Sequence, residues 1–223
     1  MKRLFFTSIV LFFQICNTIG QDIAIGFKNQ IKFTPSATVN FVYKGLEFSY
    51  ERKFSRRTSV QMSAMYFVDL FKVYPTGWTD FQGFRLSGEG KYFIKIKKYV
   101  HYYLSFGLSY DESSFLTIER FGPQAWLRDS TAEARSYLDS ISIETQGSAL
   151  NCKFGIQVPL KHFIIDLSVG VGAKHWNIWH EDRLNSDDKL GAVFHKRYKY
   201  WITEQGKRYT IDIPVSIKMG YIF

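Results

Sequence analysis

Charged side chains recur at every second position within several apolar stretches of this 223-residue chain. Successive residues of a β-strand point to opposite faces, so this spacing gathers charges of both signs on one face. Enclosed charges are costly unless they pair with one another. We therefore expect an interior polar network of ion pairs, made by Lys28, Glu47, Glu51, Arg85, Glu89, Lys91, Lys153, Asp166 and Lys218. The alternative is a gated path for small ions, formed when these pairs exchange partners.

Two other clusters are similar to ligand-binding motifs but lack the required geometry. Residues 170–174 read Gly-Val-Gly-Ala-Lys, without the Walker spacing or a following helix. Small residues on a crowded inner face explain this run better. His175 and His180, near Glu181 and Asp182, could coordinate a metal, but a strand turns positions 175 and 180 to opposite faces. We expect neither a metal site nor a cofactor.

Basic residues alternate with aromatic ones shortly before the last strand. Lysine and arginine pair with phosphates, and aromatic rings pack on sugars. Candidate contacts with a surface glycan are Lys196, Arg197, Lys199, Trp201, Lys207 and Arg208, with Tyr198 and Tyr200 between them. The other interpretation is that this stretch only extends the last hairpin.

The last thirteen residues, 211–223, alternate strictly between apolar and wetter side chains. Ile211, Ile217 and Phe223 belong to the apolar set, and Asp212 and Lys218 to the wetter set. A tilted strand crosses a bilayer in roughly 9–11 residues. This segment is therefore long enough to span a membrane as a strand.

Seven further segments alternate in the same way, which indicates eight strands of one type. They cover residues 23–33, 46–54, 59–66, 84–94, 100–110, 150–160 and 163–174. Tyrosines and one phenylalanine lie toward the ends of the apolar faces, as aromatic girdles do: Tyr50, Phe54, Tyr66, Tyr92, Tyr99, Tyr110 and Tyr221. The sequence predicts an all-β fold, an eight-stranded antiparallel up-and-down transmembrane β-barrel. Eight strands enclose a space that side chains just fill, so no wide channel is expected.

The connections between these segments alternate in length. Short turns are expected at 55–57, 95–98 and 161–162, and long loops at 34–42, 69–80, 111–147 and 180–208. Short turns on one side and long loops on the other are typical of a transmembrane barrel. In the third long loop, Ser130 and Glu133 form a capping-box pattern that predicts a short helix through Leu138.

The N-terminus has the features of an export signal. Lys2 and Arg3 precede an apolar run over residues 4–13, and Thr18 and Gly20 are small residues before a cut at Gln21. We expect a cleaved signal peptide (1–20) and a single barrel domain (21–223). A lipoprotein anchored at Cys16 and an uncleaved anchor are the alternatives. Cleavage lowers the formal net charge from +9 to +7 and leaves Cys152 without a disulfide partner.

Strand patterns such as GLEFSYER at 45–52 and KFGIQVPL at 153–160 carry a family resemblance. The chain resembles the small eight-stranded outer-membrane barrels of the OmpX and OmpA-membrane-domain type, found in Gram-negative bacteria. The resemblance implies an outer-membrane location with both termini periplasmic. It also implies contact with outer-membrane lipid and lipopolysaccharide, and recognition by the barrel-assembly machinery through an assembly signal at Tyr221 and Phe223. A partner protein in the same membrane is a further expectation, and nucleic acid is not.

Catalysis needs a separate check, because lipid A deacylases and palmitoyltransferases also use small outer-membrane barrels. A deacylase of that kind has His-x-Ser on one strand face, and none of the five histidines has serine two residues later. A triad of His180 or His195 with loop aspartate and serine remains open. We expect no catalytic residues and a structural or surface-binding role, with a lipid A-modifying enzyme or a narrow ion channel as alternatives. A soluble lipocalin-like barrel would instead carry its apolar residues inside.

Overall fold

The structure, a computed structural model, describes residues 29–38, 44–68, 79–97, 99–122, 137–185, 189–190 and 204–223. The predicted signal peptide, its cleavage site and the first part of the predicted strand 23–33 lie outside these ranges. Within them the chain is almost entirely β-structure, with one four-residue helix, α2 (Pro35–Thr38). No helix in the described part of the chain is long and apolar enough to cross a membrane.

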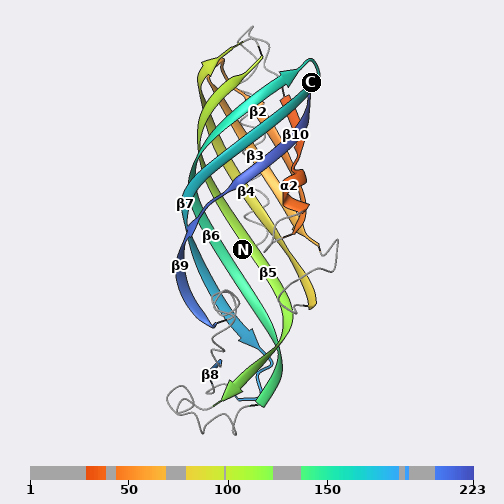
Figure 1. Ribbon diagram of the computed structural model, residues 1–223, viewed down its shortest axis with the longest axis vertical. Coiled ribbons are helices and arrows are strands. Elements are labelled where there is room, and N and C mark those ends of the chain that lie inside the picture. The colour runs from red at the N-terminus through yellow and green to blue at the C-terminus, as the bar shows by residue number, and fades with distance from the viewer. Residues whose placement is uncertain are drawn as a thin grey trace, which may run out of the picture.

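The strands lengthen toward the middle of the chain and are steeply tilted (Figure 1). In chain order they are β1 (Asn29–Phe33), β2 (Gly45–Lys53), β3 (Thr58–Phe67), β4 (Thr79–Ile96), β5 (His101–Gly122), β6 (Tyr137–Leu160), β7 (Phe163–Glu181), β8 (Lys189–Leu190), β9 (Gly206–Asp212) and β10 (Val215–Ile222). β8 is a two-residue strand that pairs with the end of β5.

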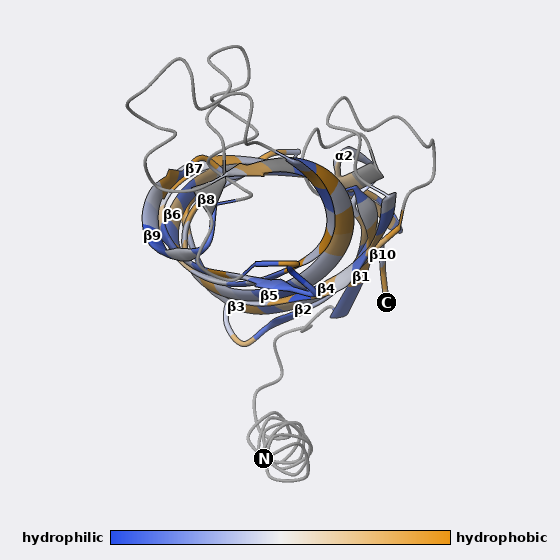
Figure 2. Cartoon of the chain, turned by 90° about the horizontal axis from the view of Figure 1, so that it is seen from below, coloured by the Kyte–Doolittle hydropathy of each residue, from blue (hydrophilic) through white to orange (hydrophobic). Residues whose placement is uncertain are grey.

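The strands form a ring through antiparallel pairing. Each strand from β1 to β6 pairs with the next, and β10 pairs with β7 on one edge and with β1 on the other. The ring is seen end-on in Figure 2. With β9 and β10 sharing one position, this confirms the predicted all-β, up-and-down antiparallel fold.

The predicted final strand, 211–223, is divided in two. β9 ends at Asp212 and β10 begins at Val215, with Ile213 and Pro214 between them. Proline has no N–H to donate to a neighbouring strand, so it interrupts the pairing. The Pro214 carbonyl still accepts a hydrogen bond from the Gly170 N–H at 2.9 Å. The alternation was read correctly, but the proline breaks the strand.

Short turns connect the strands at the end of the ring where the C-terminus lies. β6 and β7 are joined by Lys161 and His162, as predicted. The turn expected at 95–98 lies slightly later, because β4 continues to Ile96 and the Lys97 N–H donates to the Val100 carbonyl at 2.9 Å. We call this the short-turn end and the opposite one the long-loop end.

Side chains of β5 alternate as predicted up to Tyr110. Leu104, Phe106 and Leu108 face outward and are 51–59% exposed, whereas Ser105 and Gly107 are buried inside. On the neighbouring strands, too, apolar side chains face outward and small or polar ones face inward, so a continuous apolar belt surrounds this part of the ring. Cys152 lies in the belt on β6 and is exposed.

Beyond Tyr110 the same alternate positions still face inward, but several of them are now large apolar residues. Phe115 and Phe121 of β5 point inward and are only 2% and 0% exposed, and Ile141 and Ile143 of β6 are fully buried beside them. The outer face now carries polar residues such as Glu112 and Ser140, although Leu116 and Ile118 also face outward there. The interior therefore holds charged and polar side chains at the short-turn end, and an apolar cluster among a few buried polar residues, such as Thr117 and Thr145, at the long-loop end.

The long strands β5 and β6 correct the predicted third loop, 111–147. β5 continues to Gly122 and β6 begins at Tyr137, with the two strands paired through Phe121 and Tyr137. The expected helix through Leu138 is wrong at that residue, which lies in β6, while Ser130 and Glu133 lie outside the described residues. The other predicted loops shift less: 34–42 contains α2, β4 begins at Thr79, and β7 ends at Glu181.

An apolar cluster fills the long-loop half of the ring. Its buried members come from α2 and five strands, and burying each large side chain contributes about 1.5–3 kcal/mol. They are Ala37, Met65, Phe67, Phe81, Phe115, Phe121, Ile141, Ile143 and Ile178, with Tyr137 and Trp176 packed against them. The cluster holds the extended parts of β5, β6 and β7 together.

Candidate functional site

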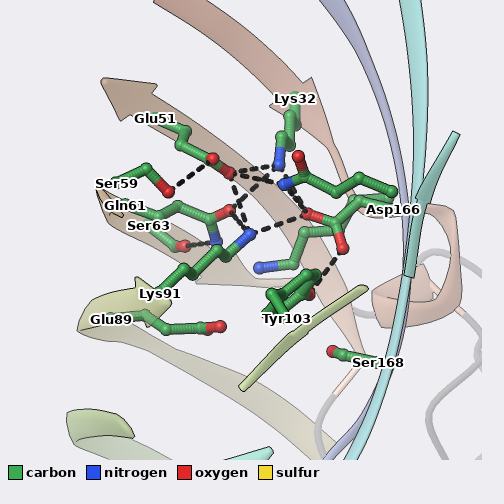
Figure 3. Close-up of polar contacts among 12 residues, drawn as sticks. Lys32, Glu51, Ser59, Gln61, Ser63, Glu89, Lys91, Tyr103, Asp166 and Ser168 are labelled. Carbon is green, nitrogen blue, oxygen red and sulfur yellow. Dashed lines mark hydrogen bonds and ion pairs between the residues drawn. The ribbon is translucent and has the colours of Figure 1, made fainter. Parts of the chain in front are cut away.

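Four charged side chains meet inside the short-turn half of the ring (Figure 3). We call Lys32 of β1, Glu51 of β2, Lys91 of β4 and Asp166 of β7 the quartet. The Lys32 Nζ lies 2.5 Å from both Glu51 Oε2 and Asp166 Oδ2. The Lys91 Nζ lies 2.8 Å from Glu51 Oε2 and 2.7 Å from Asp166 Oδ2. Each lysine thus bridges both carboxylates, and the four formal charges cancel.

Neutral polar side chains complete the hydrogen bonding of the quartet. Ser59 Oγ donates to Glu51 Oε1 at 2.7 Å, and the Tyr103 hydroxyl donates to Asp166 Oδ1 at 2.6 Å. Gln157 Nε2 donates to Glu51 Oε2 and Asp166 Oδ2, both at 3.0 Å, and Gln61 Oε1 accepts from Lys91 at 2.9 Å. These bonds supply the additional partners that a buried ion pair needs.

The quartet is inaccessible to solvent. Its four side chains are 0–2% exposed, and the Tyr103 and Phe93 rings are each 1% exposed. Phe93 lies edge-on to Tyr103 with ring centroids 5.8 Å apart. Charged groups and rings therefore fill the lumen toward the short-turn end.

Further ion pairs follow toward the long-loop end. Lys153 Nζ lies 2.7 Å from Glu89 Oε2, and Lys218 Nζ lies 3.3 Å from Glu47 Oε1. Above them, Asp111 Oδ1 lies 2.6 Å from Lys174 Nζ and 3.6 Å from Arg85 Nε. Lys174 also lies over the Trp176 ring, 3.6 Å from its centroid, where the ion pairs meet the apolar cluster.

The residues predicted for the interior network can now be placed. Lys28 lies outside the described residues. The other eight face inward, and each takes part in an ion pair: Glu47, Glu51, Arg85, Glu89, Lys91, Lys153, Asp166 and Lys218. Sequence reasoning missed three ionic members of the network, Lys32, Asp111 and Lys174. Lys32 and Lys174 alternate in phase with the others, so parity alone could have found them.

The candidate glycan contacts are only partly described. Lys196, Arg197, Lys199 and Trp201 lie outside the described residues. Lys207 is exposed on the outer face of β9, two residues from Tyr209. Arg208 faces the other way and forms an ion pair with Glu204. The structure therefore leaves Lys207 available to solvent and engages Arg208 within the chain.

The predicted assembly signal lies at the short-turn end. Phe223 pairs with Asn29 in both directions, its N–H donating to the Asn29 carbonyl and its carbonyl accepting from the Asn29 N–H, each at 3.0 Å. Tyr221 faces outward, stacked on His162 at 5.9 Å between ring centroids and edge-on to Phe163 at 6.0 Å. The last residues thus pair β10 with β1, and we call this junction the seam.

The described histidines lie apart from one another. His175 packs on Tyr209 at 4.9 Å on the outer face, whereas His180 packs edge-on to Phe121 inside. The two histidines are therefore on opposite faces, as the alternation required. No group of three or more metal-ligating side chains occurs among the described residues.

Neither a protein-family model nor a curated protein matches the chain. Among solved structures it is similar to a major outer membrane protein from Thermus thermophilus, with 12% sequence identity and a TM-score of 0.45 over 88% of this chain and 98% of that one. It is also similar to Ail, the attachment invasion locus protein of Yersinia pestis. That match has 16% identity and a TM-score of 0.33, over 88% of this chain and 94% of Ail.

Proposed function

We propose that this protein is a non-enzymatic outer-membrane β-barrel whose lumen is sealed and whose long-loop end serves a structural or surface-binding role. The observation that carries the proposal is the end of the continuous outward apolar run of β5 at Tyr110, which is followed on the same face by Glu112. The outward apolar run of β5, from Tyr102 to Tyr110, matches the roughly 9–11 residues with which a tilted strand crosses a bilayer. The belt is therefore suited to the hydrocarbon core of a bilayer, and the parts of β5 and β6 beyond it are suited to an aqueous environment.

The extension beyond the belt supports the surface role. A strand that only spans the membrane needs none of the residues after Tyr110, yet β5 continues to Gly122 with an apolar interior of its own. We propose that the long-loop end lies outside the cell and the short turns and both termini lie in the periplasm, as is usual for outer-membrane barrels. The extension would then present the loops above the lipid headgroups.

Contact with lipopolysaccharide is the finer part of the proposal. Lys207 is exposed two residues from Tyr209, at the upper border of the belt, where headgroup phosphates would lie. Replacing Lys196, Arg197, Lys199, Lys207 and Arg208 by glutamine should reduce co-purification of lipopolysaccharide while leaving folding intact. Because exposed charges are screened by salt, co-purification of lipopolysaccharide with the wild-type protein should also fall as ionic strength rises. Unchanged co-purification would contradict the contact.

Cysteine labelling in intact cells tests the placement. In a Cys152→Ala background, Ser140→Cys on the outer face of the extension should react with a membrane-impermeant maleimide. Arg56→Cys in a short turn should react only after the outer membrane is opened. Wild-type Cys152, facing lipid, should stay unlabelled until the protein is denatured. Labelling of Arg56→Cys but not Ser140→Cys in intact cells would reverse the orientation, and labelling of Cys152 would contradict the belt.

The proposed absence of catalysis has its own test. Lipid A from a strain lacking the protein should give the same mass spectrum as lipid A from its parent. A lost or gained acyl chain would instead establish a lipid A-modifying enzyme.

A further inference from the structure

A cavity of about 690 Å³ lies between the quartet and the apolar cluster. Its polar side is lined by Glu47, Glu89, Asn151, Lys153 and Lys218, and its apolar side by Met65, Trp176 and Ile178. Pockets that hold one small-molecule ligand usually measure about 300–1,000 Å³. The cavity is therefore large enough for one molecule with a polar and an apolar part.

Two buried acceptors in this cavity have no hydrogen-bond donor among the described residues. They are Glu89 Oε1 and Asn151 Oδ1, on residues that are only 6% and 7% exposed. Burying an acceptor without a donor is unfavourable. Native proteins therefore supply such groups with a partner, either a protein group, water or a ligand.

The two acceptors flank one glycine. Gly107 is paired with Glu89 on one side and Asn151 on the other. A Cβ atom added to Gly107 would lie 3.0 Å from Asn151 Oδ1 and 3.8 Å from Glu89 Cβ. Without a side chain at Gly107, a single ligand head group can approach both acceptors.

The cationic groups of the cavity already have carboxylate partners. Lys153 is paired with Glu89 through the other oxygen, Oε2, at 2.7 Å, and Lys218 with Glu47 at 3.3 Å. Lys174 is paired with Asp111 at 2.6 Å, and Arg85, which also lines the cavity, lies 3.6 Å from the same carboxylate oxygen. Because these cations lie beside carboxylates while Glu89 Oε1 and Asn151 Oδ1 have no donor among the described residues, the site favours a head group that donates hydrogen bonds.

The cavity reaches the outer face beside β9. Its lining includes inward-facing Asp212 and Ser216 and also outward-facing Ile211 and Ile213 of the same chain segment. In the described part of the chain β9 pairs only with β7, so its other edge is open. Tyr209 and Ile211 beside this edge are 81% and 77% exposed, compared with 59% for Leu108 elsewhere in the belt. This edge connects the cavity with the apolar belt.

We propose that the cavity binds an amphipathic molecule with a single apolar chain and a head group that donates hydrogen bonds. The head, an ammonium or a hydroxyl, donates to Glu89 Oε1 and Asn151 Oδ1. The chain packs against Met65, Trp176 and Ile178, and the molecule enters from the lipid-facing side past the open edge of β9. An anionic head has no such donors and would meet the Glu89 carboxylate.

Three probes with the same dodecyl chain test the head group: dodecylamine, dodecanol and dodecanoate, each brominated at the chain end. Bromine quenches tryptophan fluorescence on contact, and Trp176 lines the cavity. In purified full-length protein in lipid nanodiscs, the amine and the alcohol should quench saturably and bind at least about tenfold more tightly than the carboxylate. This saturable part should vanish in Trp176→Phe. Equal or tighter binding of dodecanoate would overturn the proposal.

A matched pair of variants tests the location. Ser87→Phe adds a ring on the inner face, where Ser87 lines the cavity, and should abolish saturable quenching. Gly90→Phe adds the same ring nearby on the outer face of β4, where an added Cβ meets no atom within 4 Å, and should leave quenching unchanged. Saturable quenching that survives Ser87→Phe would place the probe elsewhere and overturn the proposal.

Two acceptor variants test the contacts themselves. Asn151→Leu should weaken the amine and the alcohol about tenfold, and Glu89→Gln should weaken the amine more than the alcohol because it removes the charge. Asn151→Leu should leave the carboxylate probe unchanged, whereas Glu89→Gln should not weaken it, because that variant removes the carboxylate that repels an anionic head. Heat-modifiable gel mobility confirms folding for each variant, and undiminished amine binding in folded Asn151→Leu and Glu89→Gln would contradict the assigned acceptors.

Discussion

Lys32 Nζ and Asp166 Oδ2 lie 2.5 Å apart, although the two residues are 134 positions apart in the chain. Their strands, β1 and β7, are not neighbours, because β10 lies between them. The contact therefore crosses the inside of the ring rather than running along a ladder. A bond of this kind can form only when the ring is assembled.

Removing one member of the quartet should destabilise the protein strongly. Lys32→Met leaves both carboxylates with one lysine, and breaking a buried pair costs about 3–5 kcal/mol. Denaturant unfolding of the refolded protein in detergent measures the loss. Lys95→Met, at an exposed position near the end of the same sheet, should change stability by less than about 0.5 kcal/mol. Equal effects of the two variants would mean that the quartet contributes nothing specific.

Wild-type protein should show little conductance in planar bilayers, because the quartet and the rings beside it fill the lumen. The double variant Glu51→Gln/Asp166→Asn removes both carboxylates and leaves two lysines that repel each other. The double variant should either show measurable current steps in planar bilayers or lose the gel mobility of the folded protein. Large, stable currents from the wild type would favour the narrow-channel alternative.

Charge placed on the belt should be costly in proportion to its depth. Ile217→Arg puts an arginine within the lipid-facing part of β10, at a cost of about 2–4 kcal/mol if it lies near the midplane. Tyr209→Arg, near the belt border, should cost about 0–1 kcal/mol. The measurement is refolding equilibrium in lipid vesicles. If the inward-facing Ser216→Arg were more damaging than Ile217→Arg, the assigned facing of β10 would be reversed.

The terminal residue should matter through its backbone as well as its ring. Deleting Phe223 removes the paired hydrogen bonds to Asn29 at the seam and should lower the fraction of protein that inserts. Phe223→Leu keeps those bonds and removes only the aromatic ring. Heat-modifiable protein in outer-membrane fractions measures both variants. Impairment by Phe223→Leu equal to that by the deletion would assign the effect to the aromatic assembly signal alone.

The sequence predicted the belt well because one rule, apolar side chains outside and small or polar ones inside, holds for every strand there. Leu104, Phe106 and Leu108 alternate with small or polar residues for the same reason as Ile217 and Met219 far away in the chain. Local parity therefore determined both the strands and the face of each side chain. It could not determine partners, since Lys32 meets Asp166 only through the assembly of the ring.

The prediction failed where the rule changes along a single strand. After Tyr110 the same alternate positions stay buried, but some of them, such as Phe115, are now apolar, and polar residues occupy both faces nearby. A strand that carries apolar residues on both faces, without the clear alternation of the belt, was taken for a loop. The same misreading removed Asp111 from the network, because it was assigned to the start of that loop.

In the proposed outer-membrane location, the end of the outward apolar run at Tyr110 also fixes the depth of the protein in the bilayer. If the ring sank by one repeat of the alternation, Glu112 would enter the hydrocarbon, and if it rose by one, Tyr102 and its neighbours would leave it. Both displacements raise the free energy of the protein in the membrane, so the outward residues of β5 determine its position along the membrane normal. A membrane with a thicker hydrocarbon layer would therefore have to thin around this protein, because the strand cannot slide to meet it.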